Sequence, residues 1–187
     1  MKHLFRGLLV AGLVSLASAT YAQEFVVGPV EYSERVPDEA AEANVLYRRT
    51  LDWTENRFTY TPKQVIRTDS VKGEVRVAGT MKVKTASASG QLQEWPVLFE
   101  FVFRTLPTGY EYSVGYFRVM PNVKKPEETV PLEEFVTRLT LERNNARTHN
   151  DRRVTAQATS LASEVAMSFR SYLNSRPAAG AIGETTK

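Results

Sequence analysis

The hydrophobic period of the chain changes once, after Phe58, and this change restricts the fold more than any other feature. Before it, apolar residues recur at spacings of three and four, which indicates an amphipathic helix from about Glu39 to Arg57. After it, four segments alternate apolar and polar residues, as half-buried strands do. A weaker strand pattern precedes the helix, within Phe25–Val36. The order strand, helix and four strands predicts an α+β fold with an antiparallel sheet.

The last two predicted strands flank a tight turn. Leu106–Gly109 has proline second and glycine fourth, which fits a β-turn. The segment before it, Trp95–Arg104, and the segment after it should therefore form an antiparallel hairpin. In the second of these strands we expect Tyr116 to share a face with Tyr112.

The strand Trp95–Arg104 is apolar on both sides. Its phenylalanines share one face, whereas Leu98 and Val102 lie on the other. A strand of this kind needs a cover on each face. We expect the helices that begin at Pro131 to cover the second face, or a second subunit to do so.

The core positions of this region resemble those of a known family. They are Leu46, Tyr47, Trp53, Phe58, Val65, Ile66, Asp69, Gly73, the strand Val75–Val83 and the hairpin Phe99–Tyr112. In these positions the chain is similar to the bacterial domain-of-unknown-function family 4468 (DUF4468) over roughly Val30–Met120. The resemblance implies a TBP-like fold in β-α-β-β-β-β-α order and a secreted or envelope protein. No activity is assigned to the family, so it supplies no catalytic residues.

The N-terminus has the three zones of a secretory signal peptide in the required order. Lys2 and Arg6 make it positive, and Gly7–Leu16 is apolar but too short to span a bilayer of roughly 30 Å. Small residues then allow cleavage after Ala19 or Ala22, and the polar residues that follow favour Ala22. We expect export to the periplasm or beyond, without membrane insertion after the signal is removed.

The remaining chain is long enough for one compact domain. Of 187 residues, 165 remain after the leader, enough to bury roughly 70% of the unfolded surface. We divide the sequence into residues 1–22 (signal peptide), 23–129 (TBP-like α+β domain), 130–176 (C-terminal helical extension) and 177–187 (disordered tail).

The charge of the chain opposes a nucleic-acid partner. Two of its 24 basic residues lie in the leader, which leaves 22 basic against 21 acidic residues. Such a balance gives little phosphate neutralisation. A TBP-like fold suggests that Phe99, Phe101 and Phe103 could act as wedges in DNA, but alternate aromatic residues on a central strand are more often core. We therefore expect no nucleic-acid binding.

No catalytic or metal-binding set can be identified. The chain has no cysteine, so disulfides, a lipid-anchored terminus and thiolate metal sites are excluded. His149 is the single histidine after the leader, with no readable serine or carboxylate partner. The acidic pairs Glu127–Glu128 and Glu133–Glu134 fit solvated surfaces better than a catalytic dyad. We expect no cofactor, no metal and no enzymatic activity.

Aromatic and apolar residues of the last hairpin form the candidate binding surface. Tyrosine combines an apolar ring with a polar hydroxyl, as interfaces often require. The alternative is that these rings pack beneath the helices. The candidates are Trp95, Leu98, Val102, Tyr110, Tyr112 and Tyr116.

Three functions fit these observations. The first is a non-enzymatic envelope or secreted protein that binds a protein or a small ligand. The second is a hydrolase of envelope polymers that uses carboxylates or His149. The third is a structural subunit of an envelope assembly, which includes a homo-oligomer.

Overall fold

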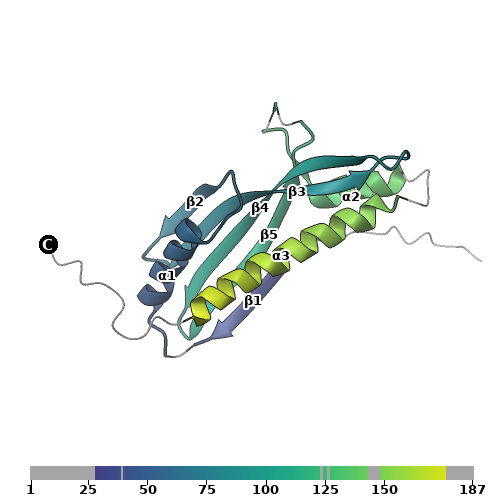
Figure 1. Ribbon diagram of the computed structural model, residues 1–187. Coiled ribbons are helices and arrows are strands. Elements are labelled where there is room, and N and C mark those ends of the chain that lie inside the picture. The colour runs from purple at the N-terminus through teal and green to yellow at the C-terminus, as the bar shows by residue number, and fades with distance from the viewer. Residues whose placement is uncertain (1–27, 39, 123, 126, 143–147, 176–187) are drawn as a thin grey trace, which may run out of the picture.

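The computed structural model describes residues 28–175 except 39, 123, 126 and 143–147. Its elements form the α+β fold expected from the sequence, with one helix after the first strand and a run of strands before the C-terminal helices (Figure 1). The expected signal peptide and the tail 177–187 lie outside the described residues. The elements are β1 (Tyr32–Pro37), α1 (Ala43–Asn56), β2 (Gln64–Asp69), β3 (Glu74–Ala86), β4 (Leu92–Leu106), β5 (Gly109–Val119), β6 (Val130–Pro131), α2 (Leu132–Leu141) and α3 (Asn150–Asn174).

The strands form one antiparallel sheet in the order β1-β5-β4-β3-β2, and the short β6 pairs with the end of β5. The expected hairpin is present, because β4 and β5 pair antiparallel around the turn that precedes Gly109. That glycine has φ 134°, and an added Cβ would lie 2.1 Å from the carbonyl oxygen of Val36. Only glycine fits this turn, which carries the chain past the end of β1.

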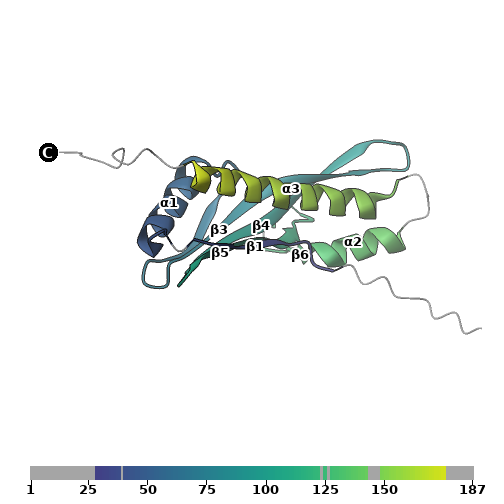
Figure 2. The ribbon, with the colours of Figure 1, turned by 90° about the horizontal axis from the view of Figure 1, so that it is seen from below.

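One face of the sheet carries the hydrophobic core. Helices α1 and α3 lie on this face (Figure 2). The rings of Trp53 from α1 and Phe169 from α3 each lie 4.8 Å from the ring of Phe101 on β4. Phe99 and Phe103, on the same face of β4, are fully buried. Each such side chain contributes roughly 1.5–3 kcal/mol through burial, so this layer dominates the stability of the domain.

The C-terminal helices complete this core. The apolar stripe of α3, which includes Val154, Val165 and Phe169, is buried in the same cluster as the sheet residues. Helix α2 buries Phe135, whose ring lies 5.3 Å from that of Trp95. Helices α2 and α3 are therefore packed against the sheet.

Helix α3 also pairs with the free edge of β3, beyond the point where β2 ends its pairing at Ala78. The side-chain amide of Gln157 accepts from the backbone N–H of Lys84 and donates to its carbonyl oxygen, at 3.0 and 2.9 Å. Asn150 does the same at Ala86, with both distances 2.8 Å. The two amides thus satisfy backbone groups that an adjacent strand would otherwise pair.

The second face of β4 differs from the expectation. Helix α3 packs on the face of Phe101, and α2 reaches the sheet through Trp95, which points to that same side. On the opposite face, which we call the open face, Leu98 and Val102 are half-buried and alternate along β4 with the charged residues Glu100 and Arg104. The C-terminal helices do not cover this face, because the large apolar stripe of α3 packs against the phenylalanines of the core face.

Helix α1 begins at Ala43, four residues later than the predicted start at about Glu39. The carboxylate of Asp38 accepts a hydrogen bond of 3.1 Å from the backbone N–H of Ala41, so it stabilises a turn ahead of the helix. The residue that precedes the helix is Glu42, which makes no side-chain cap.

Candidate binding site on the open face of the sheet

A β-bulge in β5 creates the main irregularity of the open face. Gly115 pairs with Glu100 and Arg118 pairs with Leu98, so Tyr116 and Phe117 together oppose Phe99. A bulge of this kind shifts the alternation of side chains by one residue. Phe117 consequently turns into the core, where it stacks on Phe99 at 5.8 Å.

The bulge places Tyr116 on the open face, opposite to the expectation that it shares the face of Tyr112. Its side chain is 74% exposed, and its φ of 58° lies in the left-handed region. A residue with a Cβ is disfavoured there by roughly 1–2 kcal/mol. Backbone strain together with an exposed aromatic ring is common at binding sites, where neighbouring structure holds the residue in place.

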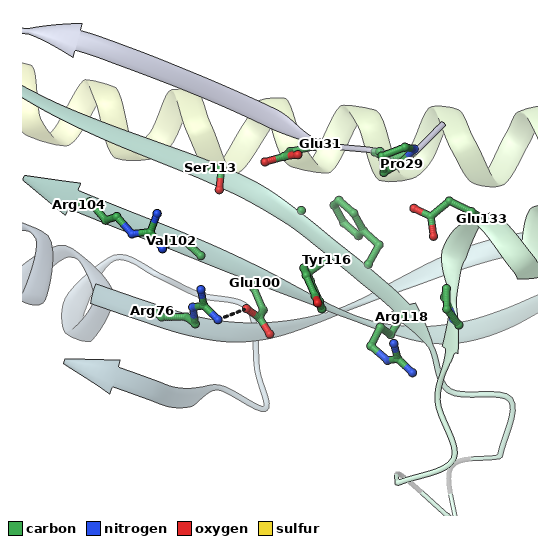
Figure 3. Close-up of a pocket in the computed structure, with 14 residues that line it drawn as sticks. Pro29, Glu31, Arg76, Glu100, Val102, Arg104, Ser113, Tyr116, Arg118 and Glu133 are labelled. Atoms are coloured by element: carbon green, nitrogen blue, oxygen red, sulfur yellow. Dashed lines mark ion pairs between the residues drawn. The ribbon is translucent and has the colours of Figure 1, made fainter. Parts of the chain in front are cut away.

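A hollow of about 620 Å³ lies on the open face around this bulge. Figure 3 shows Tyr116 projecting from β5 on the same side as the Arg76–Glu100 pair. The hollow extends from β3 across β4 and β5 to the segment before β1 and the start of α2. Its lining residues are Pro29, Val30, Glu31, Arg76, Glu100, Val102, Arg104, Ser113, Gly115, Tyr116, Phe117, Arg118, Pro131 and Glu133.

Gly115 allows one wall of the hollow to approach the sheet. A Cβ on this residue would lie 3.2 Å from Cγ of Glu31. The absence of a side chain therefore lets the segment before β1 pass close to the bulge.

The arginines of the hollow are held in different ways. Arg104 pairs with Glu74 at 3.2 Å and Glu111 at 3.7 Å, on the two neighbouring strands. Arg76 lies 3.7 Å from Glu100, and its buried Nε has no hydrogen-bond acceptor within the described part of the chain. A buried donor without a partner costs about 1–3 kcal/mol, so this arginine is incompletely satisfied.

Arg118 is fixed by neutral oxygen atoms. Its Nε donates to the hydroxyl of Thr129 at 2.7 Å, and a terminal nitrogen donates to the carbonyl oxygen of the same residue at 3.1 Å. Among residues 28–175, gaps excepted, no carboxylate forms an ion pair with Arg118. Its guanidinium is therefore oriented without being neutralised.

A second hollow of about 320 Å³ continues the site towards β1 and shares Glu31, Val102, Arg104 and Ser113 with the first. Its other lining residues include Glu34, whose carboxylate accepts hydrogen bonds from Tyr112 at 2.5 Å and Tyr32 at 3.1 Å.

The hydrogen bonds and Arg170 stabilise the ionised form of the Glu34 carboxylate. The hydrogen bond from Tyr112 is the largest cause that holds the pKa of Glu34 below its ordinary value of 4.5, and Tyr32 and Arg170 of α3 act in the same direction. Burial and the same hydrogen bond raise the pKa of the Tyr112 hydroxyl. The network ties β1 and β5 to α3.

The structure divides the six candidate residues between the two faces. Tyr110 and Tyr112 are each 2% exposed and stack at 6.2 Å in the core. Trp95 is half-buried on the core side and donates from its indole nitrogen to Thr85 at 2.9 Å. Leu98, Val102 and Tyr116 lie on the open face, and the last two line the hollow.

Of the charged residues of the hollow, only Glu133 was considered in the sequence, where it was expected on a solvated surface, although one signal for the site was present. In β5 the core residues fall on even numbers up to Val114 and on odd numbers from Phe117. This change of parity at Gly115 indicates a bulge. No comparable sequence pattern indicates that Arg118 and Glu133 line the hollow, because their positions depend on the packing of β6 and α2 beside β5.

Apart from Glu133, which lines the first hollow, the other candidates lie outside the two hollows or form ion pairs. His149 precedes α3 and does not line either hollow. Glu128 pairs with Lys125 at 2.6 Å, and Glu134 pairs with Arg138 at 3.3 Å. No group of three or more metal-binding side chains occurs among the described residues. No helix in that part of the chain is long and apolar enough to cross a membrane.

Comparison with protein families supports this fold. Residues 32–120 match the family described as a domain of unknown function (DUF4468) with TBP-like fold. The matched span ends at Met120, so α2 and α3 lie beyond it.

Solved structures extend the similarity past that span. A DUF4468 family protein from Bacteroides ovatus ATCC 8483 is 16% identical, with a TM-score of 0.52 over 80% of this chain and 88% of its own. A TBP-like protein from Parabacteroides distasonis ATCC 8503 is 14% identical, with a TM-score of 0.52 over 79% of this chain and 95% of its own. These similarities establish the fold, and the comparison with curated proteins found no match.

Proposed function

We propose that this protein, whose residues 32–120 match the DUF4468 family, is a non-enzymatic binding protein of the cell envelope and that its ligand site is the open face of the sheet. The observation that carries the proposal is Tyr116, an exposed aromatic ring held by a bulge in a conformation that L-residues rarely adopt. The ring lies in a hollow whose volume is within the range of ligand sites, roughly 300–1,000 Å³.

The core face makes a different contribution. Its phenylalanines Phe99, Phe101 and Phe103 are fully buried under the helices. They are therefore not placed to enter a DNA duplex. In this proposal they provide the rigid support on which the open face is built.

The proposal is tested by the stabilisation that a ligand confers on the folded state. Lipid, glycan and peptide fractions of a bacterial envelope are added separately to the wild-type protein and to Tyr116→Ser, and Tm is measured. At least one fraction should raise the Tm of the wild type but not that of Tyr116→Ser. The matched control is Met167→Ser, since Met167 is also exposed but lies on α3.

Two outcomes contradict this function. One is that no fraction raises the Tm of the wild-type protein. The other is that all three proteins are stabilised equally, which would place binding away from the open face.

A hydrolase is the second candidate, and one observation favours it. Glu31, Glu100 and Glu133 line the same hollow, and paired carboxylates are the usual catalytic groups of glycosidases. Release of soluble products from the glycan fraction by the wild type, with loss in Glu133→Gln, would favour catalysis. Binding without product release would favour the first proposal.

The partner can also be a protein, including a second copy of the chain. Half-buried Leu98 and Val102 would lie within such an interface. Size-exclusion chromatography with light scattering distinguishes this case. A dimer disrupted by Val102→Arg would assign the open face to self-association, whereas a monomer would leave it to another ligand.

Export is the compartment that we propose for this protein. It is supported by the order of charged, apolar and small residues at the N-terminus. N-terminal sequencing of the protein from the periplasm should begin at Gln23, or at Thr20 for the earlier site. An unprocessed chain recovered from the cytoplasm would contradict it.

A further inference from the structure

We propose that the hollow on the open face binds a short neutral oligosaccharide. This inference rests on the proposed binding function and specifies the class of its ligand. The charges of the lining residues are the first argument, since the lining contains three arginines, Arg76, Arg104 and Arg118, and as many glutamates, Glu31, Glu100 and Glu133. A lining with no net charge favours neither an anion nor a cation over a neutral ligand.

The hydrogen-bonding capacity of the same side chains is the second argument. Guanidinium groups only donate hydrogen bonds, and ionised carboxylates only accept them. A hydroxyl group does both, so a ligand rich in hydroxyls can be matched by either kind of side chain. A phosphate or sulfate only accepts, and it would meet three carboxylates of its own sign in this hollow.

The exposed ring of Tyr116 is the third argument. It is 74% exposed and lies in the same hollow as Val102. A sugar ring has an apolar face of C–H groups, which can pack against an aromatic ring while its hydroxyls reach the surrounding polar groups. The bulge fixes the backbone of Tyr116, so little conformational entropy is lost when a ligand packs against it.

The position of the hollow disfavours a peptide. Peptides often bind sheets by adding a strand to a free edge, where backbone groups are unpaired. The hollow instead lies over the middle of the sheet, where β4 is paired with β3 and β5, and where β5 pairs with β1 up to Val114 and with β6 from Arg118. The unpaired stretch of β5 there, residues 115–117, is bulged and too short to add a strand, which suits a saccharide better than an extended polypeptide.

The experiment is an NMR titration of the isotope-labelled full chain with defined probes. Cellotriose, maltotriose and N-acetylchitotriose are the neutral saccharides, trigalacturonate is the acidic one, and trialanine is the peptide. We expect one neutral saccharide to shift the amide signals of Val102, Ser113 and Arg118 in a saturable manner. Tyr116→Ala should weaken this binding by about tenfold, the value expected for one aromatic contact.

Two further variants separate ring packing from a general effect. Tyr116→Phe should retain most of the affinity, because it keeps the ring. Met167→Ala should bind as the wild type does, because it removes an exposed apolar side chain elsewhere.

The remaining outcomes overturn the assignment. Shifts at the same amides with trialanine or trigalacturonate, but not with a neutral saccharide, would overturn the ligand class and leave the open face as a binding site. Absence of shifts with every probe would also overturn the saccharide assignment. In that case the envelope-fraction experiment on Tm decides separately whether the open face binds any ligand.

Discussion

The two faces of the sheet use the same strands for opposite purposes. On the core face, β4 presents Phe99, Phe101 and Phe103, all fully buried beneath helices. On the open face, the intervening Glu100 and Arg104 make ion pairs with residues of neighbouring strands. The comparison shows that the two-residue period of a strand separates the residues that stabilise the fold from those of the proposed binding surface. Substitutions on the two faces should therefore have different consequences.

Truncation of a core aromatic residue should have the largest effect. Phe169→Ala removes a fully buried ring that contacts Phe101, Phe103 and Tyr112. We expect the free energy of unfolding to fall by about 3–5 kcal/mol. Val102→Ala on the open face should cost well under half as much, since its side chain is only half-buried. Urea denaturation of both variants measures the difference, and equal losses would contradict the division between the faces.

The amide pairing of α3 with β3 should have the next largest effect. The double variant Asn150→Ala, Gln157→Ala removes four hydrogen bonds to the backbone of Lys84 and Ala86. Each of these hydrogen bonds has a net value of about 0.5–1.5 kcal/mol. Because water partly replaces them in the variant, we expect the free energy of unfolding to fall by roughly 2 kcal/mol. The exposed edge should also increase aggregation, which light scattering at rising concentration detects.

Gln157→Glu is the informative single control for this edge. It keeps the acceptor for the backbone N–H of Lys84 and loses the donor to its carbonyl oxygen. Its stability should lie between those of the wild type and Gln157→Ala. An unchanged stability in the double variant would show that solvent replaces the amides fully.

A substitution at the bulge should stabilise the protein, whereas most substitutions destabilise one. Tyr116→Gly removes a side chain that has few contacts to lose and relieves a left-handed backbone of φ 58°. We expect the free energy of unfolding to rise by about 0.5–1 kcal/mol, while ligand binding is lost. Tyr112→Gly, four residues earlier on β5 and in the buried network, should instead be strongly destabilising. Loss of stability in Tyr116→Gly would contradict backbone strain at this residue.

The smallest effect should be a pH dependence at the border of the two faces. The pKa of Glu34 is lowered in the folded state, chiefly by the hydrogen bond from Tyr112. Its contribution to stability is therefore present above the ordinary pKa of 4.5 and is lost as the pH falls through the lower folded value. Unfolding curves between neutral and acidic pH should show a steeper loss for the wild type than for Glu34→Gln. Parallel curves would mean that the carboxylate is not stabilised by its partners.

Much of the fold could be predicted because the spacing of apolar residues in the sequence matches the faces that are buried in the structure. The helix that contains Trp53, the hairpin around Gly109 and the stripe of α3 all follow from the spacing of apolar residues. The start of α1 was predicted less accurately, because the hydrogen bond that Asp38 accepts from Ala41 stabilises a turn in place of the first helical turn.

The candidate site was only partly predictable. Val102 and Tyr116 belong to it, whereas Tyr110, Tyr112 and Trp95 are packed on the core side. An aromatic residue on a strand has the same sequence signature whether it faces a core or a ligand. The bulge then reversed the face of Tyr116, although the shift of the apolar positions after Gly115 indicates it in retrospect.

The sequence by itself determined the order of helix and strands and which residues of β4 are large enough to form a core, because these depend on local periodicity and side-chain size. Only the tertiary structure decided that α3 covers the phenylalanine face and leaves Val102 on an open surface. It also brought Arg76, Arg118 and Glu133 together, from β3, β5 and α2. The physical reason is that burial of the largest apolar area selects one face for the helices, and the remaining face collects whichever charged residues the strand register places there.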